Sequence, residues 1–251
     1  MEISTPTFEL IKKLILDDYT YIRNDISDTT TGMPLFHSIL SGIALGDGRT
    51  HSAFKKANIT NEVGIKAITE LCEMEVIRLE PSKKEFTTWA DDYKISDKLL
   101  FNTPFMRFWF AFVSPIFKGI KEGDYKEVQK RFENKQADFV SFMFEQLSLE
   151  LVKLEFKNDP IVESGSYWDK DVEIDLYAKT KSGKIVVGSC RYSNSKVKKS
   201  ELTKLQEKCE VAKIKADIFV ISSKKGFSSE LKALKGDNLK LFTLKNLIKL
   251  V

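Results

Sequence analysis

The chain has 251 residues, of which 42% are hydrophobic and 30% are charged, as expected for a globular protein with a substantial apolar core. No run approaches the length of about eighteen apolar residues that a membrane span needs. The opening residues, MEISTPTFEL, also lack the basic and apolar regions of a signal peptide. These features exclude a membrane partner, and we expect a cytoplasmic protein.

Charge is distributed unevenly along the chain, whose formal net charge is +4. Residues 181–251 hold 17 Lys and Arg against 6 Asp and Glu, a balance of +11, whereas the first 180 residues hold 23 against 30, a balance of −7. So basic a segment is a candidate to bind a polyanion, although scattered lysines also keep helix surfaces soluble. The three cysteines, Cys72, Cys190 and Cys209, have no CxxC spacing and predict buried thiols, not disulfides or a zinc site.

The first residues predict an amphipathic helix followed by a linker. Residues 7–24 place Leu10, Leu14 and Tyr21 at roughly helical spacing. The polar stretch DISDTTTG, residues 25–32, then predicts a linker. Together with residue 33 this part forms an N-terminal helix and linker, residues 1–33.

Residues 34–98 predict a winged helix-turn-helix domain. One helix begins at Pro34 and stops near Gly46, and a short helix follows at residues 50–58. A third helix lies within residues 59–76, and two short strands, Val76–Leu79 and Tyr93–Ser96, form the wing. The third helix is capped by Thr60 or Asn61 and carries one apolar face, comprising Val63, Ala67, Leu71 and Met74.

From Pro104 the stretch PFMRFWFAFVSPIFKGI is dense in aromatic residues that must be largely buried. It predicts a helical bridge between two modules, assigned to residues 99–137. Residues 138–251 then alternate helices and strands, which is typical of an α/β core. The expected order is a helix over 138–154, strands near 171–178 and 184–191, a helix near 198–214, a strand over 216–223, a helix near 228–235, a strand in LKLFTL and a short closing helix.

Several motifs carry a resemblance to a known family. The runs KISDKLLFNTPFMRFWFAFVSPIFKGIKEGDY, FEQLSLEL, YWDKDVEIDLYA and VVGSCRY closely resemble the C-terminal half of a family of archaeal and bacterial ATPases. In that family a P-loop domain precedes a winged helix and a PD-(D/E)XK nuclease-like domain. The resemblance covers about residues 35–225. It implies an α+β protein with a C-terminal restriction-endonuclease-like domain over residues 138–251. No GxxxxGK[ST] motif occurs, so we expect a stand-alone protein without ATPase activity.

The resemblance also implies four active-site positions. It places the family's helix glutamate at Glu145 and its first strand aspartate at Asp175, while its Glu-x-Lys reads Ser189, Cys190 and Arg191 here. Hydrolysis of a phosphodiester needs carboxylates to hold a cation such as magnesium, and an arginine cannot lose a proton as a lysine can. The changed positions therefore indicate a vestigial nuclease centre without a metal, in which Arg191 still offers a fork for phosphate.

Each of these positions also has a plain structural interpretation. The alternation of DVEIDLYA places Val172, Ile174 and Leu176 on one face of a strand and Asp175 on the other, so Asp175 also fits an ordinary solvated face. Glu145 fits an ordinary helix-surface charge equally well. Both interpretations stay open at this point.

The two modules differ in their suitability for nucleic acid. The third helix of the predicted winged-helix domain is net acidic, and we therefore expect it to bind DNA poorly. Basic residues gather instead after the second hairpin strand and on the next helix, where they would contact a phosphate backbone without reading its sequence. These expected nucleic-acid-binding residues are Arg191, Lys196, Lys198, Lys199, Lys204 and Lys208.

Three functions from different classes remain. The favoured one is a non-catalytic nucleic-acid-binding protein, directed to DNA without sequence specificity, that needs no cofactor. The second is a magnesium-dependent nuclease with a rearranged site, in which Glu173 or Glu163 supplies the missing carboxylate and Lys196 the missing lysine. The third is a protein-interaction module that uses the acidic winged helix as its contact surface.

Overall fold

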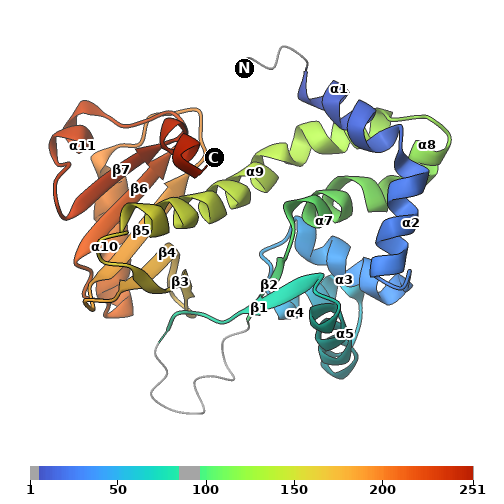
Figure 1. Cartoon of the computed structure of the whole chain (residues 1–251). Helices are drawn as coiled ribbons and strands as arrows, with labels where there is room; N and C mark the ends of the chain where they lie inside the picture. Colours follow the sequence, from blue (N-terminus) through green and yellow to red (C-terminus); the bar gives the residue numbers. More distant parts are fainter. Residues whose placement is uncertain (1–5, 85–96, 251) are drawn as a thin grey trace. The chain divides into compact units, whose positions relative to one another are not determined.

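The computed structural model describes residues 6–84 and 97–250 and divides into two compact units. The first unit comprises residues 1–81 and 96–139, and the second comprises residues 82–95 and 140–251. Figure 1 shows the two units as a helical part and a part built on a sheet. The long helix α9 (Lys126–Glu155) contributes its first half to the first unit and its second half to the second.

The first unit is mostly helical. Its short sheet pairs β1 (Ile77–Glu80) with β2 (Lys98–Phe101) in antiparallel register. The predicted first wing strand agrees with β1 to within one residue, whereas the predicted strand Tyr93–Ser96 lies outside the described residues. Its helical elements are α1 (Thr7–Ile11), η1 (Lys12–Leu16), α2 (Tyr19–Thr29), α3 (Pro34–Ala44), α4 (Thr50–Ala57), α5 (Asn61–Glu73), α7 (Pro104–Phe108), η2 (Trp109–Val113), η3 (Ser114–Ile116) and α8 (Phe117–Lys121).

The N-terminal helix differs from its prediction in phase and in length. Leu14 and Tyr21 are 64% and 77% exposed, while Leu16 and Tyr19 are buried. The cause is the π-helical segment η1, in which the amide of Asp17 donates to the carbonyl of Lys12 at 2.9 Å. One extra residue in a turn rotates the following side chains, so a regular helical period assigns the wrong face. Helix α2 also continues to Thr29, through most of the predicted linker.

Helix α5 begins as predicted, because the Thr60 side chain accepts a hydrogen bond from the amide of Val63. Its apolar face is rotated from the prediction, since Val63 is 42% exposed and Gly64 is buried. A Cβ on Gly64 would lie 2.6 Å from atoms of the Phe54 ring. Only glycine therefore lets α4 and α5 pack this closely, and the buried stripe follows Gly64, Ala67, Ile68 and Leu71.

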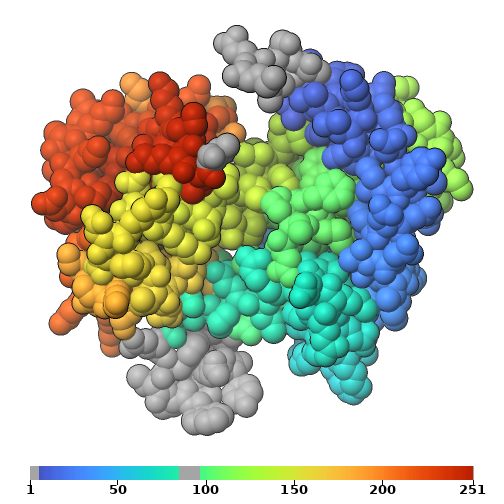
Figure 2. Space-filling view, viewed as in Figure 1, coloured from blue at the N-terminus to red at the C-terminus, as the bar shows by residue number. Residues whose placement is uncertain are grey.

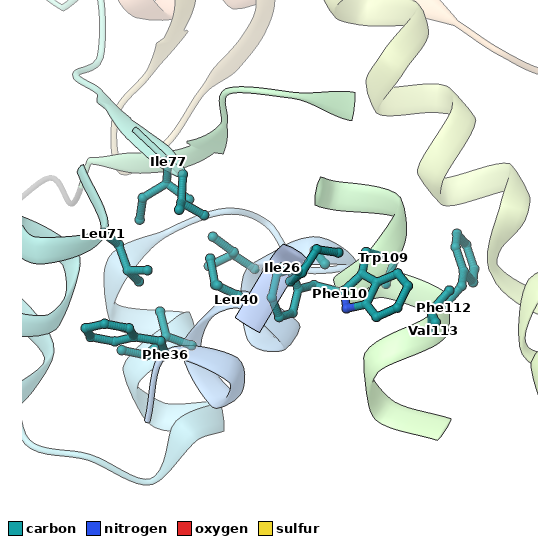
Figure 3. Close-up of a cluster of buried hydrophobic side chains, with 14 of the residues drawn as sticks. Ile26, Phe36, Leu40, Leu71, Ile77, Trp109, Phe110, Phe112 and Val113 are labelled. Atoms are coloured by element: carbon teal, nitrogen blue, oxygen red, sulfur yellow. The ribbon is translucent and has the colours of Figure 1, made fainter. Parts of the chain in front are cut away.

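One apolar cluster forms the core of the first unit (Figure 3). All five residues of the π-helical segment Trp109–Val113 are at most 2% exposed. The Trp109 ring stacks on Tyr19 of α2, with centroids 5.6 Å apart and an interplanar angle of 9°. Burial is confirmed for Trp109, Phe110 and Phe112, whereas Phe105 and Phe117 of the same stretch are 42% and 47% exposed. The role of the stretch as a bridge between modules stays a prediction. Figure 3 shows side chains from α2, α3, α5 and β1 in the same cluster, among them Ile26, Phe36, Leu40, Leu71 and Ile77.

The second unit is built on a five-stranded sheet in the order β3-β4-β5-β6-β7. The pairs β3–β4 and β4–β5 are antiparallel, and β5–β6 and β6–β7 are parallel. A parallel neighbour requires a crossover, and helices supply it after β5 and after β6. The elements are β3 (Ile161–Trp168), β4 (Glu173–Thr180), β5 (Ile185–Arg191), α10 (Lys199–Ala212), β6 (Ile218–Ser223), α11 (Ser229–Ala233), β7 (Leu239–Thr243) and η4 (Leu244–Leu250).

Helices α9 and α10 cover opposite faces of this sheet. Val186 packs with Leu151 of α9, while its neighbour Val187 packs with Leu205 of α10. Successive residues of a strand point to opposite faces, so β5 serves two apolar layers. Figure 2 shows the closing residues of η4, in dark red, lying against the yellow end of α9, where Lys249 pairs with Glu155.

The segment Ser82–Lys84 runs beside β3. The amide of Lys83 donates to the carbonyl of Ser166 at 3.1 Å. The Ser82 hydroxyl donates to the Trp168 carbonyl at 2.5 Å and accepts from the Trp168 amide at 2.9 Å. Lys83 also pairs with Glu163 at 3.4 Å. These contacts pair β3, an outer strand of the sheet, with the short segment Ser82–Lys84.

The coarse fold class, α+β, is therefore confirmed. Most predicted helices and strands of the second unit are present, but β3 was not predicted, and α9 begins twelve residues before the predicted start at Asp138. No helix of the described residues is long and apolar enough to cross a membrane. The four predicted segment boundaries stay a prediction.

Candidate functional site at the end of the β4–β5 hairpin

A bulge in β4 sets the direction of Asp175. Gly165 pairs with Tyr177 but Tyr167 pairs with Ile174, so Asp175 and Leu176 together oppose the single residue Ser166. A bulge of this kind bends a strand and redirects a side chain. The predicted alternation is therefore wrong beyond Ile174, because Ile174 packs on the α10 side and Leu176 on the α9 side.

The Asp175 carboxylate accepts hydrogen bonds from the neighbouring strand β5. Its Oδ2 atom accepts from the amide of Cys190 at 2.8 Å and lies 3.3 Å from the hydroxyl oxygen of Ser189. It also accepts from Nη1 of Arg191 at 3.2 Å. The structure thus brings Asp175, Ser189 and Arg191 into direct contact. The Asp175 side chain is only 16% exposed, so it is more than a solvated charge on an open face.

A second carboxylate, which was not predicted, completes the cluster from α10. Nη2 of Arg191 lies 2.6 Å from Oε1 of Glu201, and the Ser189 hydroxyl donates to the same oxygen at 2.8 Å. The guanidinium therefore bridges two carboxylates from different elements. We call Asp175, Ser189, Arg191 and Glu201 the arginine cluster.

Electrostatics within the arginine cluster favour its ionised form. Burial acts to raise the pKa of Glu201, but hydrogen bonds from Arg191 and Ser189 outweigh it and hold this pKa below the usual value. Burial would likewise lower the pKa of Arg191, yet the charges of Asp175 and Glu201 raise it. The two carboxylates therefore stabilise the charged form of Arg191 at its position between them.

Glu145, the fourth predicted position, lies on α9. The Cys190 thiol of β5 is buried. Burial chiefly raises the pKa of this thiol, and the charges of Asp175 and Glu145 raise it further. Glu145 therefore lies within electrostatic range of the hairpin, and Cys190 is an unreactive buried thiol. Of the other cysteines, Cys209 is buried and Cys72 half-buried, and all three are free.

The arginine cluster does not fit a magnesium ion as it stands. Magnesium needs oxygen ligands at about 2.0–2.1 Å in octahedral geometry. Here a guanidinium lies between the two carboxylates, 3.2 Å from Asp175 and 2.6 Å from Glu201. Within residues 6–84 and 97–250, no group of three His, Cys, Asp or Glu side chains is arranged to hold a metal.

The predicted basic residues extend from the arginine cluster onto α10. Lys196 and Lys198 are exposed in the segment between β5 and α10. Lys199 lies 3.6 Å from Glu230, and Lys208 donates to the carbonyl of Glu173 at 2.7 Å, while Lys204 is exposed. Their chain positions place Lys196 and Lys198 beyond the same end of β5 as Arg191.

The two carboxylates of the rearranged-nuclease alternative lie on β3 and at the start of β4. Glu163 of β3 pairs with Lys83, and Glu173 is exposed at the start of β4. Glu201 is instead the carboxylate that meets Asp175 across Arg191. One signal in the sequence could have found it: an acidic residue in the first turn of the helix that directly follows the hairpin.

The fold and site define a mixed α+β protein whose five-stranded sheet carries a bridged ion-pair cluster at one hairpin end. Residues 109–204 match a family model (DUF234) described as archaeal and bacterial proteins of unknown function. This agrees with the archaeal and bacterial resemblance, whereas the nuclease-like character stays a prediction.

A solved structure titled "Crystal Structure of Protein of Unknown Function AF1548" is 19% identical, with a TM-score of 0.33. The similarity covers 43% of this chain and 65% of that chain, so this chain spans slightly less than two thirds of that protein. No curated protein matches the chain.

Proposed function

We propose that the protein binds nucleic acid, most simply DNA without sequence preference, through a degenerate PD-(D/E)XK nuclease-like domain in the second unit. The observation that carries this proposal is the exposure of Lys196 and Lys198 beyond the end of β5, next to the site where Arg191 bridges Asp175 and Glu201. A guanidinium between two carboxylates supplies the positive charge that a metal would otherwise supply. It cannot deprotonate a water as a lysine can.

The order of elements supports the nuclease-like interpretation. After the long helix α9 and the strand β3 come an antiparallel hairpin, β4 and β5, a crossover helix, α10, and a parallel strand, β6. Apart from β3, this is the order predicted from the sequence pattern. The three helices α3, α4 and α5 with the β1–β2 pair likewise fit a winged helix-turn-helix domain.

Charge supports the second unit as the binding module. The exposed lysines beyond β5 lie in the segment of balance +11. Lysines that neutralise phosphates release counterions without reading base edges, so affinity is salt-dependent and nearly indifferent to sequence.

The test is a binding titration with labelled duplex DNA, single-stranded DNA and RNA between about 50 and 200 mM salt. Replacing Lys196 and Lys198 by glutamine should weaken binding equally for all duplex sequences. It should also flatten the logarithmic salt slope by about 0.9 for each phosphate that is no longer neutralised. Lys181→Gln with Lys184→Gln is the matched control, because this pair lies at the β4–β5 turn, the opposite end of β5.

Two results would contradict the proposal. If the substitutions in both lysine pairs lowered affinity equally, binding would reflect general charge attraction and not a site beyond β5. If the wild-type protein did not bind nucleic acid at low salt, the proposal would be wrong. Cleavage in magnesium or manganese that disappears in Asp175→Asn would favour the nuclease alternative instead.

A second function, docking of a protein partner, is favoured by the exposed side of the first unit. On α5, Val63 and Ile65 are 42% and 56% exposed, and Leu79 of β1 is 45% exposed. Exposed apolar side chains among acidic ones suit a protein partner better than a phosphate backbone. The double substitution Asn61→Ala with Lys66→Ala should leave the affinity for DNA unchanged. If this variant lost affinity for DNA, α5 would be assigned as the DNA-binding helix.

A further inference from the structure

A pocket of about 470 Å³ lies within the first unit, and its described lining residues include none of those proposed to bind nucleic acid. Its volume falls in the range of small-molecule sites, about 300–1,000 Å³. Helix α2 contacts α8, and α3 packs against η2 and η3, so these elements form its walls. The lining residues used below are Arg23, Ser27, His37, Ser41, Ser114 and Phe117.

Hydrogen bonds fix the His37 ring in this pocket. The Thr30 hydroxyl donates its proton to the carbonyl of Ile26 at 2.7 Å, so it can only accept from Nε2 of His37, 3.3 Å away. The other ring nitrogen, Nδ1, is then an acceptor for the Ser114 hydroxyl at 3.3 Å. The ring edge also meets Phe110, with centroids 5.2 Å apart. The tautomer of a neutral His37 is thereby determined.

The charged and hydroxyl side chains that line the pocket can donate hydrogen bonds to a ligand. Among its described lining residues, Arg23 carries a full charge at neutral pH and no Asp or Glu is present. Burial and the charge of Arg23 both lower the pKa of His37. The hydroxyls of Ser27 and Ser41 have no hydrogen-bond partner among the described residues. A guanidinium with nearby hydroxyl donors is suited to a carboxylate or phosphate.

The remaining wall is apolar. Trp109, Pro34 and Pro115 line it, and Phe117 lies there with 47% of its surface exposed. A large exposed aromatic side chain beside a cavity offers a flat contact for a ring. The pocket thus combines an anion-binding group with a surface for an apolar group.

We propose that this pocket binds a small organic anion, in which a carboxylate or phosphate is joined to a flat apolar group. Arg23, Ser27 and Ser41 hold the oxygens, and Phe117 with Pro115 contacts the apolar part. The site is independent of the proposed nucleic-acid binding, and its test shares no variant with that proposal.

The test uses phenyl phosphate and benzoate as probes. Inorganic phosphate, which has no aromatic ring, and benzyl alcohol, which has no negative charge, are the controls. Binding is followed by NMR of the imidazole groups, because the chain has two histidines and the second, His51, is exposed on α4. A bound anion opposes the charge of Arg23, so the pKa of His37 should rise with saturation while the His51 signal stays unchanged by the probe. At least one aromatic anion should bind about tenfold more tightly than either control, and the stronger of the two identifies the oxyanion.

Matched variants separate a specific site from general attraction. Arg23→Gln should lower affinity about tenfold, the effect of removing one charge-assisted hydrogen bond. Lys13→Gln removes the same charge from an exposed residue outside the pocket and should leave affinity unchanged. Ser41→Ala, a small change at the pocket wall, should weaken the anions but not benzyl alcohol. An equal effect of Lys13→Gln, equal binding of benzyl alcohol, or an unchanged His37 signal would overturn the proposal.

Discussion

The apolar core of the first unit and the arginine cluster of the second unit are held together by different interactions. In the first unit, five consecutive residues, Trp109–Val113, are buried without a charge among them, and aromatic rings pack on every side. In the second, the arginine cluster lies at the sheet end and is held by directional bonds between charged groups. Apolar packing depends on volume, whereas the cluster depends on each partner being present. The difference predicts which substitutions each unit tolerates.

The largest effect is expected in the apolar cluster. Trp109→Ala removes a 2% exposed ring that stacks on Tyr19 and leaves a cavity, which should lower the free energy of unfolding by about 3–5 kcal/mol. Chemical denaturation monitored by circular dichroism measures it. Leu14→Ala, at a 64% exposed position of the same unit, should change stability by less than about 0.5 kcal/mol. A smaller loss in Trp109→Ala than in Leu14→Ala would contradict the assigned core.

An intermediate effect is expected when the bridging cation is removed. Arg191→Ala leaves Asp175 and Glu201 without their shared partner. It should cost about 1–2 kcal/mol, less than the loss of a fully buried partner because Arg191 is 37% exposed and screened by water. Adding Glu201→Gln to this variant should restore stability in part, since one of two like charges is removed. Lys225→Ala, at an exposed position, is the control. Additive losses in the double variant would show that Arg191 and Glu201 are not coupled.

The smallest effect concerns acid stability. The pKa of Glu201 is lower in the folded protein than its unfolded value of about 4.3, so its ion pair stabilises the fold above that pH. This contribution, about 1 kcal/mol, should be lost as the pH falls through the folded pKa. Urea denaturation at successive pH values should therefore show a shallower acid dependence in Glu201→Gln than in the exposed control Glu207→Gln. Identical profiles would refute the assigned ion pair.

Regular elements were predictable from the sequence because their signals are local. Pro34, the Thr60 cap and the short apolar runs of the second unit each specify their element within a few residues. Irregular turns were not predictable in this way. The π-helical segment Lys12–Leu16 and the bulge at Asp175 each add one residue to a repeat, so the exposed positions Leu14 and Tyr21 and the direction of Leu176 were assigned wrongly.

The candidate site was predictable in its hairpin half only. The resemblance supplied Asp175, Ser189 and Arg191, which the fold brings together through strand pairing. Glu201 is far from Asp175 in sequence, and its contribution depends on how α10 packs on the sheet, which no local pattern specifies. The pocket around His37 was missed for the same reason, because its walls come from α2, α3 and the aromatic segment.

The segment Ser82–Lys84 beside β3 has a consequence for self-association. An unpaired outer strand offers its amides and carbonyls to another chain and can template aggregation. Here the segment already occupies the carbonyl of Ser166 and both backbone groups of Trp168, and the Lys83–Glu163 pair places charges along the same edge. An incoming strand would have to displace these bonds before it could add to the sheet, so this edge is protected against fibril-like growth even though Val162 is 64% exposed.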